Sequence, residues 1–212
     1  MLDHPIVDLI SAVRDAFERA LLERQAVEER FQVDVFLGDL SWETSYSLPG
    51  EGQPPRVRAD LSFDWPTWSQ TAYRSWSIGE TPDELPEVVV EVAMRIQRLA
   101  EAPTVEQVLA VLPTASPELG GEPLERSATT IEEVRTDPDT REGATEAGNG
   151  PAVRWAVEAA YEGSIRFEES QLEDPATIGP VVDVLTRWVS STLVQLADLP
   201  LKFLPPDPAE ES

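Results

Sequence analysis

The sequence predicts an α+β fold in which an antiparallel, four-stranded or larger meander sheet carries amphipathic helices on one face. Two observations lead to this prediction. Near both ends of the chain, apolar residues recur every three or four positions, which is typical of helices with one buried side. Between these segments, polar and apolar residues alternate over several stretches, which is typical of strands with one wet and one dry face. With 212 residues, 41% of them apolar, the chain can bury a substantial core.

The first helix is predicted over residues 5–29, and Pro5 suits its first turn, where no amide donor is needed. The period then changes to two over residues 31–37, which predicts a strand. The pair Gly38-Asp39 is typical of a tight hairpin turn, so the next strand is expected to begin at once.

Two strands with strict alternation follow, over residues 40–48 and 57–65, and a Pro- and Gly-rich stretch separates them. A fourth, less regular strand is predicted over residues 67–78, at an edge of the sheet. The positions predicted to share the dry face of the two regular strands are Leu40, Trp42, Thr44, Tyr46 and Leu48, then Val57, Ala59, Leu61, Phe63 and Trp65.

Helices are predicted to end this N-terminal α-β-β-β-β-α-α region, residues 1–113. The residues from Thr81 to Glu84 are typical of a helix start, with a capping threonine, a proline and a glutamate that can complete a capping box. An apolar stripe at helical spacing predicts that this helix continues to Leu99. Thr104 and Gln107 have the spacing of a second capping box, so a short helix is expected there.

Residues 114–150 show no sustained period and are rich in proline, glycine and acidic side chains. We interpret them as a mobile acidic linker, because they lack the apolar surface needed to offset the entropy of ordering.

Residues 151–205 are predicted to pack a hairpin and a long helix on the same sheet. The hairpin is expected to turn at Glu162-Gly163, although residues 152–161 also fit a helix, and both alternatives stay open. The long helix is predicted over residues 177–198, and residues 206–212 form a polar tail.

The chain carries 40 acidic and 16 basic side chains, with a formal net charge of −24. Nucleic acids and anionic membranes bind clustered lysine and arginine, so we expect neither as a direct partner. A basic or amphipathic protein is the favoured partner, because the field of an acidic surface speeds its encounter with cations. The charge itself is explained more simply by solubility or by a compositional bias, which the near absence of lysine supports.

Composition excludes most catalytic constellations. The chain has no cysteine, and His4 is its single histidine, so neither a Cys-His pair nor a Cys/His zinc site can form. Asp60 and Asp64 share a predicted strand face with Arg56 and Arg58, which we interpret as interleaved charges on a solvated surface. We therefore expect no catalytic residue, no metal and no cofactor.

Aromatic residues gather in and beside the predicted edge strand. Trp68, Tyr73 and Trp76 are the candidates for an exposed binding surface, since tryptophan and tyrosine are enriched at binding hot spots. Trp42, Phe63 and Trp65 lie on the dry face of regular strands and are interpreted as core.

These observations favour a non-enzymatic protein-interaction module of the adaptor, chaperone-like or immunity type, which binds another protein chain. The alternative is a carbohydrate- or small-ligand-binding domain that uses the same three aromatic residues. No apolar run is long enough to cross a bilayer and the first residues lack a secretory pattern, so a cytoplasmic location is expected. The sequence leaves the oligomeric state open.

Overall fold

The computed structural model describes residues 4–24, 30–33, 38–135, 153–170 and 177–206. Within these segments all strands join one antiparallel sheet, which confirms the predicted α+β class. The helices are α1 (His4–Arg19), α2 (Thr67–Ser77), α3 (Val105–Leu109) and α5 (Gly179–Ala197). The strands are β1 (Glu23–Arg24), β2 (Arg30–Val33), β3 (Leu40–Ser47), β4 (Val57–Trp65), β5 (Glu87–Leu99), β6 (Ala115–Leu119), β7 (Glu122–Arg135) and β8 (Val153–Arg166).

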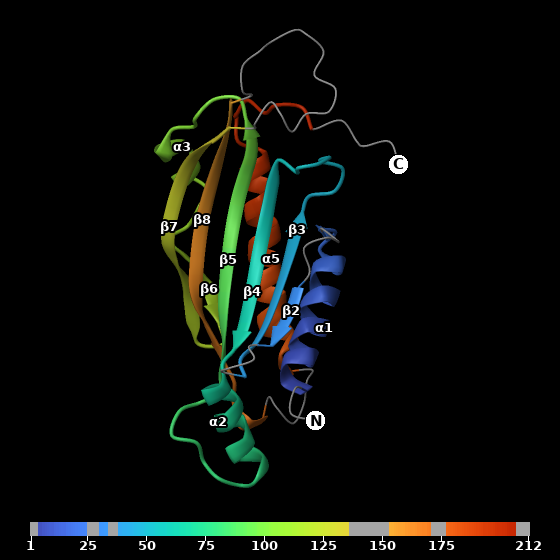
Figure 1. The fold of residues 1–212 in the computed structure, drawn as a ribbon, viewed down its shortest axis with the longest axis vertical. Coiled ribbons are helices and arrows are strands. Elements are labelled where there is room, and N and C mark those ends of the chain that lie inside the picture. Colours follow the sequence, from blue (N-terminus) through green and yellow to red (C-terminus); the bar gives the residue numbers. More distant parts are fainter. Residues whose placement is uncertain (1–3, 25–29, 34–37, 136–152, 171–176, 207–212) are drawn as a thin grey trace.

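The sheet has eight strands. Seven of them follow the order β1-β3-β4-β5-β8-β7-β6, and the eighth, β2, pairs with the same edge of β3 as β1 does, at the other end of that strand. Helices α1 and α5 contact each other and pack on the same face of the sheet; in Figure 1, α5 lies behind the strands and α1 lies beside β2 and β3. No described helix covers the opposite face, which looks toward the viewer. Helix α2 lies beyond one end of the sheet, where β4 ends and β5 begins.

The core lies between the sheet and the two covering helices. Alternate residues of β4 are buried, as the period of two requires, and Trp65 is only 1% exposed. Trp42 and Phe63 stack in the same layer, which confirms their assignment to the core. The buried residues of α5 are Val182, Leu185, Thr186, Trp188, Val189, Thr192, Leu193 and Leu196.

The predicted edge strand at residues 67–78 is wrong, because these residues form helix α2. Pro66 occupies the N-cap position in an extended conformation, and Gly79, with a φ of 78°, follows the helix end. Helical spacing turns Ser69, Tyr73 and Trp76 inward, where Ser69 is fully buried and the two aromatic rings pack against the core.

The helix predicted from Thr81 to Leu99 is also wrong, because residues 87–99 form β5, a central strand. Val88, Val90 and Val92 alternate toward the core; all three pair with β8, and Val90 and Val92 also pair with β4. Three consecutive β-branched valines favour this strand, since their side chains restrict the helical backbone.

Residues 115–135 are not the irregular linker that composition predicted. They form β6 and β7, and β7 pairs with β8 over most of its length, so backbone hydrogen bonds hold it although most of its side chains are exposed. The rest of the predicted linker, residues 136–152, lies outside the described residues.

Strand β8 is one continuous strand, which settles the open choice for residues 153–161 in favour of a strand. The predicted turn at Glu162-Gly163 is wrong, because both residues pair with β5 inside the strand. A Cβ atom on Gly163 would lie 2.9 Å from the Leu124 side chain, so a glycine is needed there for close packing and not for a turn.

Smaller differences concern the ends of elements. Helix α1 ends at Arg19 and not at residue 29, and Leu21 has a left-handed φ of 60°. Val33 pairs with Leu40, so the connection is longer than a Gly38-Asp39 turn, and residues 34–37 lie outside the described segments.

The two remaining helices agree with the sequence. Thr104 caps α3 in a capping box, and α5 lies within the range predicted for the long helix. None of the described helices is long and apolar enough to cross a membrane.

Candidate functional site

Helix α2 is attached to the start of β5 by one buried hydroxyl. Ser69 Oγ accepts hydrogen bonds from Trp65 Nε1 at 2.9 Å and from the Glu87 amide at 2.8 Å, and donates to the Glu87 carbonyl at 2.7 Å. One donor and two acceptors are the full capacity of a serine hydroxyl. This side chain therefore fixes the position of its neighbour Trp68 relative to the sheet.

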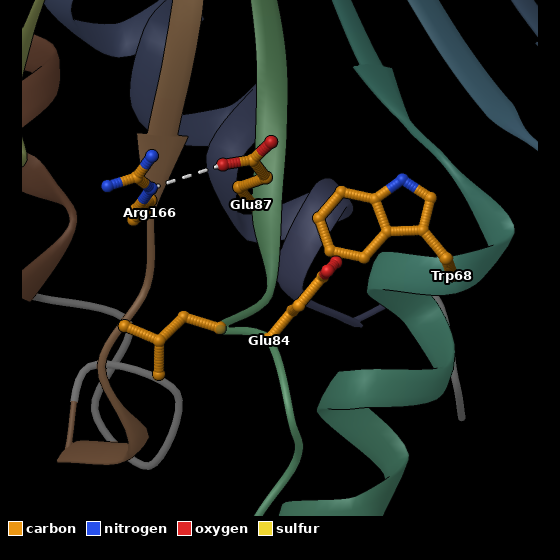
Figure 2. A pocket seen from close by; sticks show the side chains of 5 residues that line it. Trp68, Glu84, Glu87 and Arg166 are labelled. Carbon is orange, nitrogen blue, oxygen red and sulfur yellow. Dashed lines mark hydrogen bonds and ion pairs between the residues drawn. The ribbon is translucent and has the colours of Figure 1, made fainter.

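A hollow of about 360 Å³ lies beside this junction, between α2 and the adjoining ends of β5 and β8 (Figure 2). Its walls combine one aromatic ring, one aliphatic side chain, two carboxylates and one guanidinium. The lining residues are Trp68, Glu84, Leu85, Glu87 and Arg166. Trp68 is 42% exposed and Leu85 is 50% exposed, so much of the apolar surface of both remains open to solvent.

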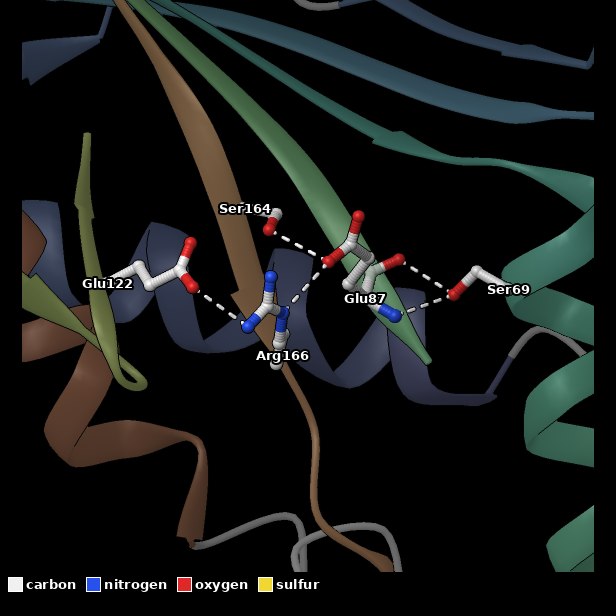
Figure 3. Close-up of polar contacts among 5 residues, drawn as sticks. All are labelled: Ser69, Glu87, Glu122, Ser164 and Arg166. Carbon is white, nitrogen blue, oxygen red and sulfur yellow. Dashed lines mark hydrogen bonds and ion pairs between the residues drawn. The ribbon is translucent and has the colours of Figure 1, made fainter. Parts of the chain in front are cut away.

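The charged wall of the hollow is a network across three strands (Figure 3). Arg166 donates from Nη1 to Glu122 Oε1 at 2.8 Å and from Nε to Glu87 Oε2 at 3.4 Å. Ser164 Oγ donates to the same Glu87 oxygen at 2.8 Å. The guanidinium thus lies between the carboxylates of Glu87 and Glu122, which balance its positive charge.

Glu84 differs from these residues because it has no hydrogen bond or ion pair to any residue that the structure describes. Its side chain points toward the Trp68 ring in Figure 2. The hollow therefore contains one carboxylate whose charge no described residue balances.

The structure separates the three predicted site residues by environment. All three lie on α2 and not on an edge strand. Trp68 is exposed and lines the hollow, whereas Tyr73 packs edge-on against Trp65, with ring centroids 5.9 Å apart. Trp76 is half-buried against the core. Of the three, Trp68 is the one that lines the hollow.

Sequence reasoning missed the other lining residues. The sequence places Glu84 at the start of the helix predicted up to Leu99 and Leu85 inside that helix, so neither residue indicates a site. Glu87 and Arg166 are Cα partners in the β5–β8 ladder, although 79 positions separate them in the chain. The sequence carries no signal for this pairing without a prior assignment of both strands.

The uncovered face of the sheet carries a row of like charges. Glu91 pairs directly with Glu162, and Glu162 pairs directly with Glu125 on the next strand. All three are exposed, and none has an ion pair within the described part of the chain. Like charges directly opposite each other on neighbouring strands are destabilising.

On the same face the charges predicted to be interleaved are only partly paired with one another: Arg58 pairs with Asp60 inside β4, whereas Arg56 pairs with Glu51. Arg58 and Arg95 both contact the Asp60 carboxylate, at 2.9 and 3.1 Å, and Asp64 accepts from Ser62 at 3.4 Å. No group of three acidic or histidine side chains that could hold a metal occurs among the described residues. The His4 side chain lies outside them.

Among the described residues, Tyr161 has a clearly shifted pKa, and it lies on the covered face of the sheet. Burial raises its pKa above the ordinary value of 10.0, while the charge of Arg126 acts in the opposite direction. Its hydroxyl donates to the Pro113 carbonyl at 2.9 Å, and its ring packs edge-on against Trp188. Tyr161 is therefore a structural residue, separated from the hollow by the sheet.

Comparison of the chain with protein-family models, with characterised proteins and with solved structures finds no match.

Proposed function

We propose that the chain is a non-enzymatic protein-interaction module that binds a segment of another protein in the hollow between α2, β5 and β8. The observation that carries this proposal is the placement of two exposed apolar side chains, Trp68 and Leu85, beside Glu84, whose carboxylate has no partner among the described residues. Tryptophan is enriched among the residues that dominate binding energy, because its large rigid surface is desolvated at a low entropic cost.

The size and position of the hollow support a short segment as its ligand. About 360 Å³ is near the lower end of the range for small-ligand sites, which is roughly 300–1,000 Å³, so the hollow accommodates one or two side chains. The surrounding chain is strongly acidic, which favours a basic partner and speeds its association at low ionic strength.

The proposal is tested by affinity capture with three versions of the protein as bait, at low and high salt. The versions are the wild type, Trp68→Ala and Val194→Ala, which truncates an exposed apolar side chain on the distant helix α5. We expect a partner that the wild type and Val194→Ala retain, that Trp68→Ala loses, and that high salt releases. A partner set unchanged by Trp68→Ala contradicts the proposal.

A carbohydrate-binding function is the second candidate, because an exposed indole beside carboxylates can also stack on a sugar ring and bind its hydroxyls. Titration with saccharides, followed through the indole N–H resonance of Trp68, separates the two functions. Saccharide binding that is insensitive to salt favours the second candidate, since sugars are uncharged.

A further inference from the structure

The hollow has the chemistry of a site for a positively charged side chain. It presents the exposed ring of Trp68, and the face of an indole attracts cations through its quadrupole. It also presents two carboxylates with free acceptor capacity. Glu84 has no partner among the described residues, and both contacts of Glu87 to described residues use Oε2, which leaves Oε1 for a ligand.

The net charge of the residues around the hollow is negative, which also favours a positively charged ligand. The Arg166 guanidinium lies between Glu87 and Glu122, and Glu84 adds a third carboxylate at the opening. In and beside the hollow there are thus three carboxylates and one guanidinium, which is already paired with two of them. A positively charged ligand is therefore attracted into the hollow, whereas a ligand carboxylate is repelled by the net negative charge around it.

We infer that the hollow recognises an arginine side chain of the partner segment, with an adjacent apolar residue of that segment packed on Leu85. This inference rests on the proposed function and names the chemistry of its partner. Arginine fits better than lysine, because its planar guanidinium stacks on Trp68 while its several N–H donors reach Glu84 and Glu87 Oε1. Lysine supplies a single, strongly hydrated charge that cannot stack in this way.

The probes are the capped tripeptides Leu-Arg-Leu, Leu-Lys-Leu and Leu-citrulline-Leu. Citrulline has nearly the shape of arginine but carries no charge, so this pair isolates the contribution of the guanidinium charge. Binding to the full chain is measured from the indole N–H resonances, and Trp68→Phe identifies the resonance of Trp68.

We expect the arginine tripeptide to bind about fivefold to thirtyfold more tightly than the citrulline tripeptide, with lysine between them. The matched variants are Glu84→Gln, which lines the hollow, and Glu80→Gln, which removes the same charge from a nearby exposed position outside the lining. Glu84→Gln is expected to weaken arginine binding at least threefold, and Glu80→Gln to change it little, because screening in salt limits the effect of more distant charges.

Equal binding of the arginine and citrulline tripeptides overturns the inference, as does the absence of arginine binding or an equal effect of the two glutamate variants. These outcomes leave the proposed function standing if the capture experiment yields a partner that Trp68→Ala loses. A capture that is insensitive to Trp68→Ala removes the proposed function itself, whatever the tripeptides do.

Discussion

Replacement of Ser69 by alanine tests whether a single hydroxyl holds α2 against the sheet. The change removes one oxygen and almost no volume, so it creates no cavity to speak of. It leaves Trp65 Nε1 and the amide and carbonyl of Glu87 without their partner. An unsatisfied buried polar group costs about 1–3 kcal/mol. Because water in the adjoining hollow can reach the Glu87 backbone, we expect a total loss near the lower bound for three groups, about 2–4 kcal/mol.

The loss is measured by urea unfolding, in which the midpoint falls and the denaturant slope stays constant. Thr71→Ala is the matched control, because its exposed hydroxyl only bonds the Thr67 carbonyl within the same helix, and we expect a change within about 0.5 kcal/mol. Faster hydrogen exchange at Trp65 Nε1 in Ser69→Ala gives a local readout. A loss below about 1 kcal/mol, or one equal to that of the control, refutes the reasoning.

Three further changes test other parts of the structure. Gly163→Ala should lower the free energy of unfolding, measured in urea, by about 1–3 kcal/mol, because its Cβ would lie 2.9 Å from a leucine side chain of β7. Gly179→Ala is the control, because its Cβ would meet open space, and it should change the stability little. Equal effects of the two variants contradict this prediction. Glu162→Gln should stabilise the fold by about 0.2–1 kcal/mol at low salt, since Glu162 lies between two glutamates. A gain no larger than that of Glu118→Gln, at an exposed position outside the row, contradicts the idea that repulsion within the row destabilises the fold. The raised pKa of Tyr161 means that the folded state holds the phenolic proton more tightly than the unfolded chain, so this contribution to stability is present below about pH 10 and is lost as pH rises through the folded pKa. Tyr161→Phe should flatten that alkaline decline, and an unchanged decline in the urea midpoint between about pH 8 and about pH 11 counts against it.

The regular strands were predictable because one of their faces is buried and the other is wet. Strands β3 and β4 have this pattern, and the sequence located both within a residue or so. Strand β5 was not recognised, because its valines at 88, 89 and 92 and Ile96 fit a helical stripe as well as an alternation. Its neighbours β4 and β8, far away in the chain, decide between the two.

Strand β7 was not predicted for the opposite reason: its sequence fits neither a helical nor a strand period. Most of its side chains are exposed, so neither period is visible, and its stability comes from backbone pairing with β8. Gly163 was misread because glycine at a turn and glycine at a close contact look the same in a sequence. The contact with Leu124 exists only after the two strands are paired.

The candidate site could be predicted only through its aromatic member. Trp68 was identified from residue type and crowding, although the element that carries it was wrong. Glu84, Leu85 and the Glu87–Arg166 pair could not be found, because the hollow forms where a helix and two strand ends meet. Local patterns do not encode such a junction.

The hollow and the row of glutamates on the uncovered face lie at different distances from a bound cation, and this distance decides how each affects binding. Glu87 and Glu91 lie on the same strand face four residues apart, so about 13 Å of extended chain separates the hollow from the glutamate row. The Debye length is about 8 Å at physiological ionic strength and about 30 Å in ten-millimolar salt. The row is therefore screened from a cation in the hollow at physiological salt and acts on its approach only in dilute buffer. Neutralising Glu91 and Glu162 together should slow association of the arginine tripeptide at low salt and leave its dissociation rate unchanged, whereas Glu84→Gln should speed dissociation at every salt concentration. Relaxation-dispersion measurements on the Trp68 resonance distinguish these rates, and a faster dissociation in the double variant would place the row in direct contact with the ligand.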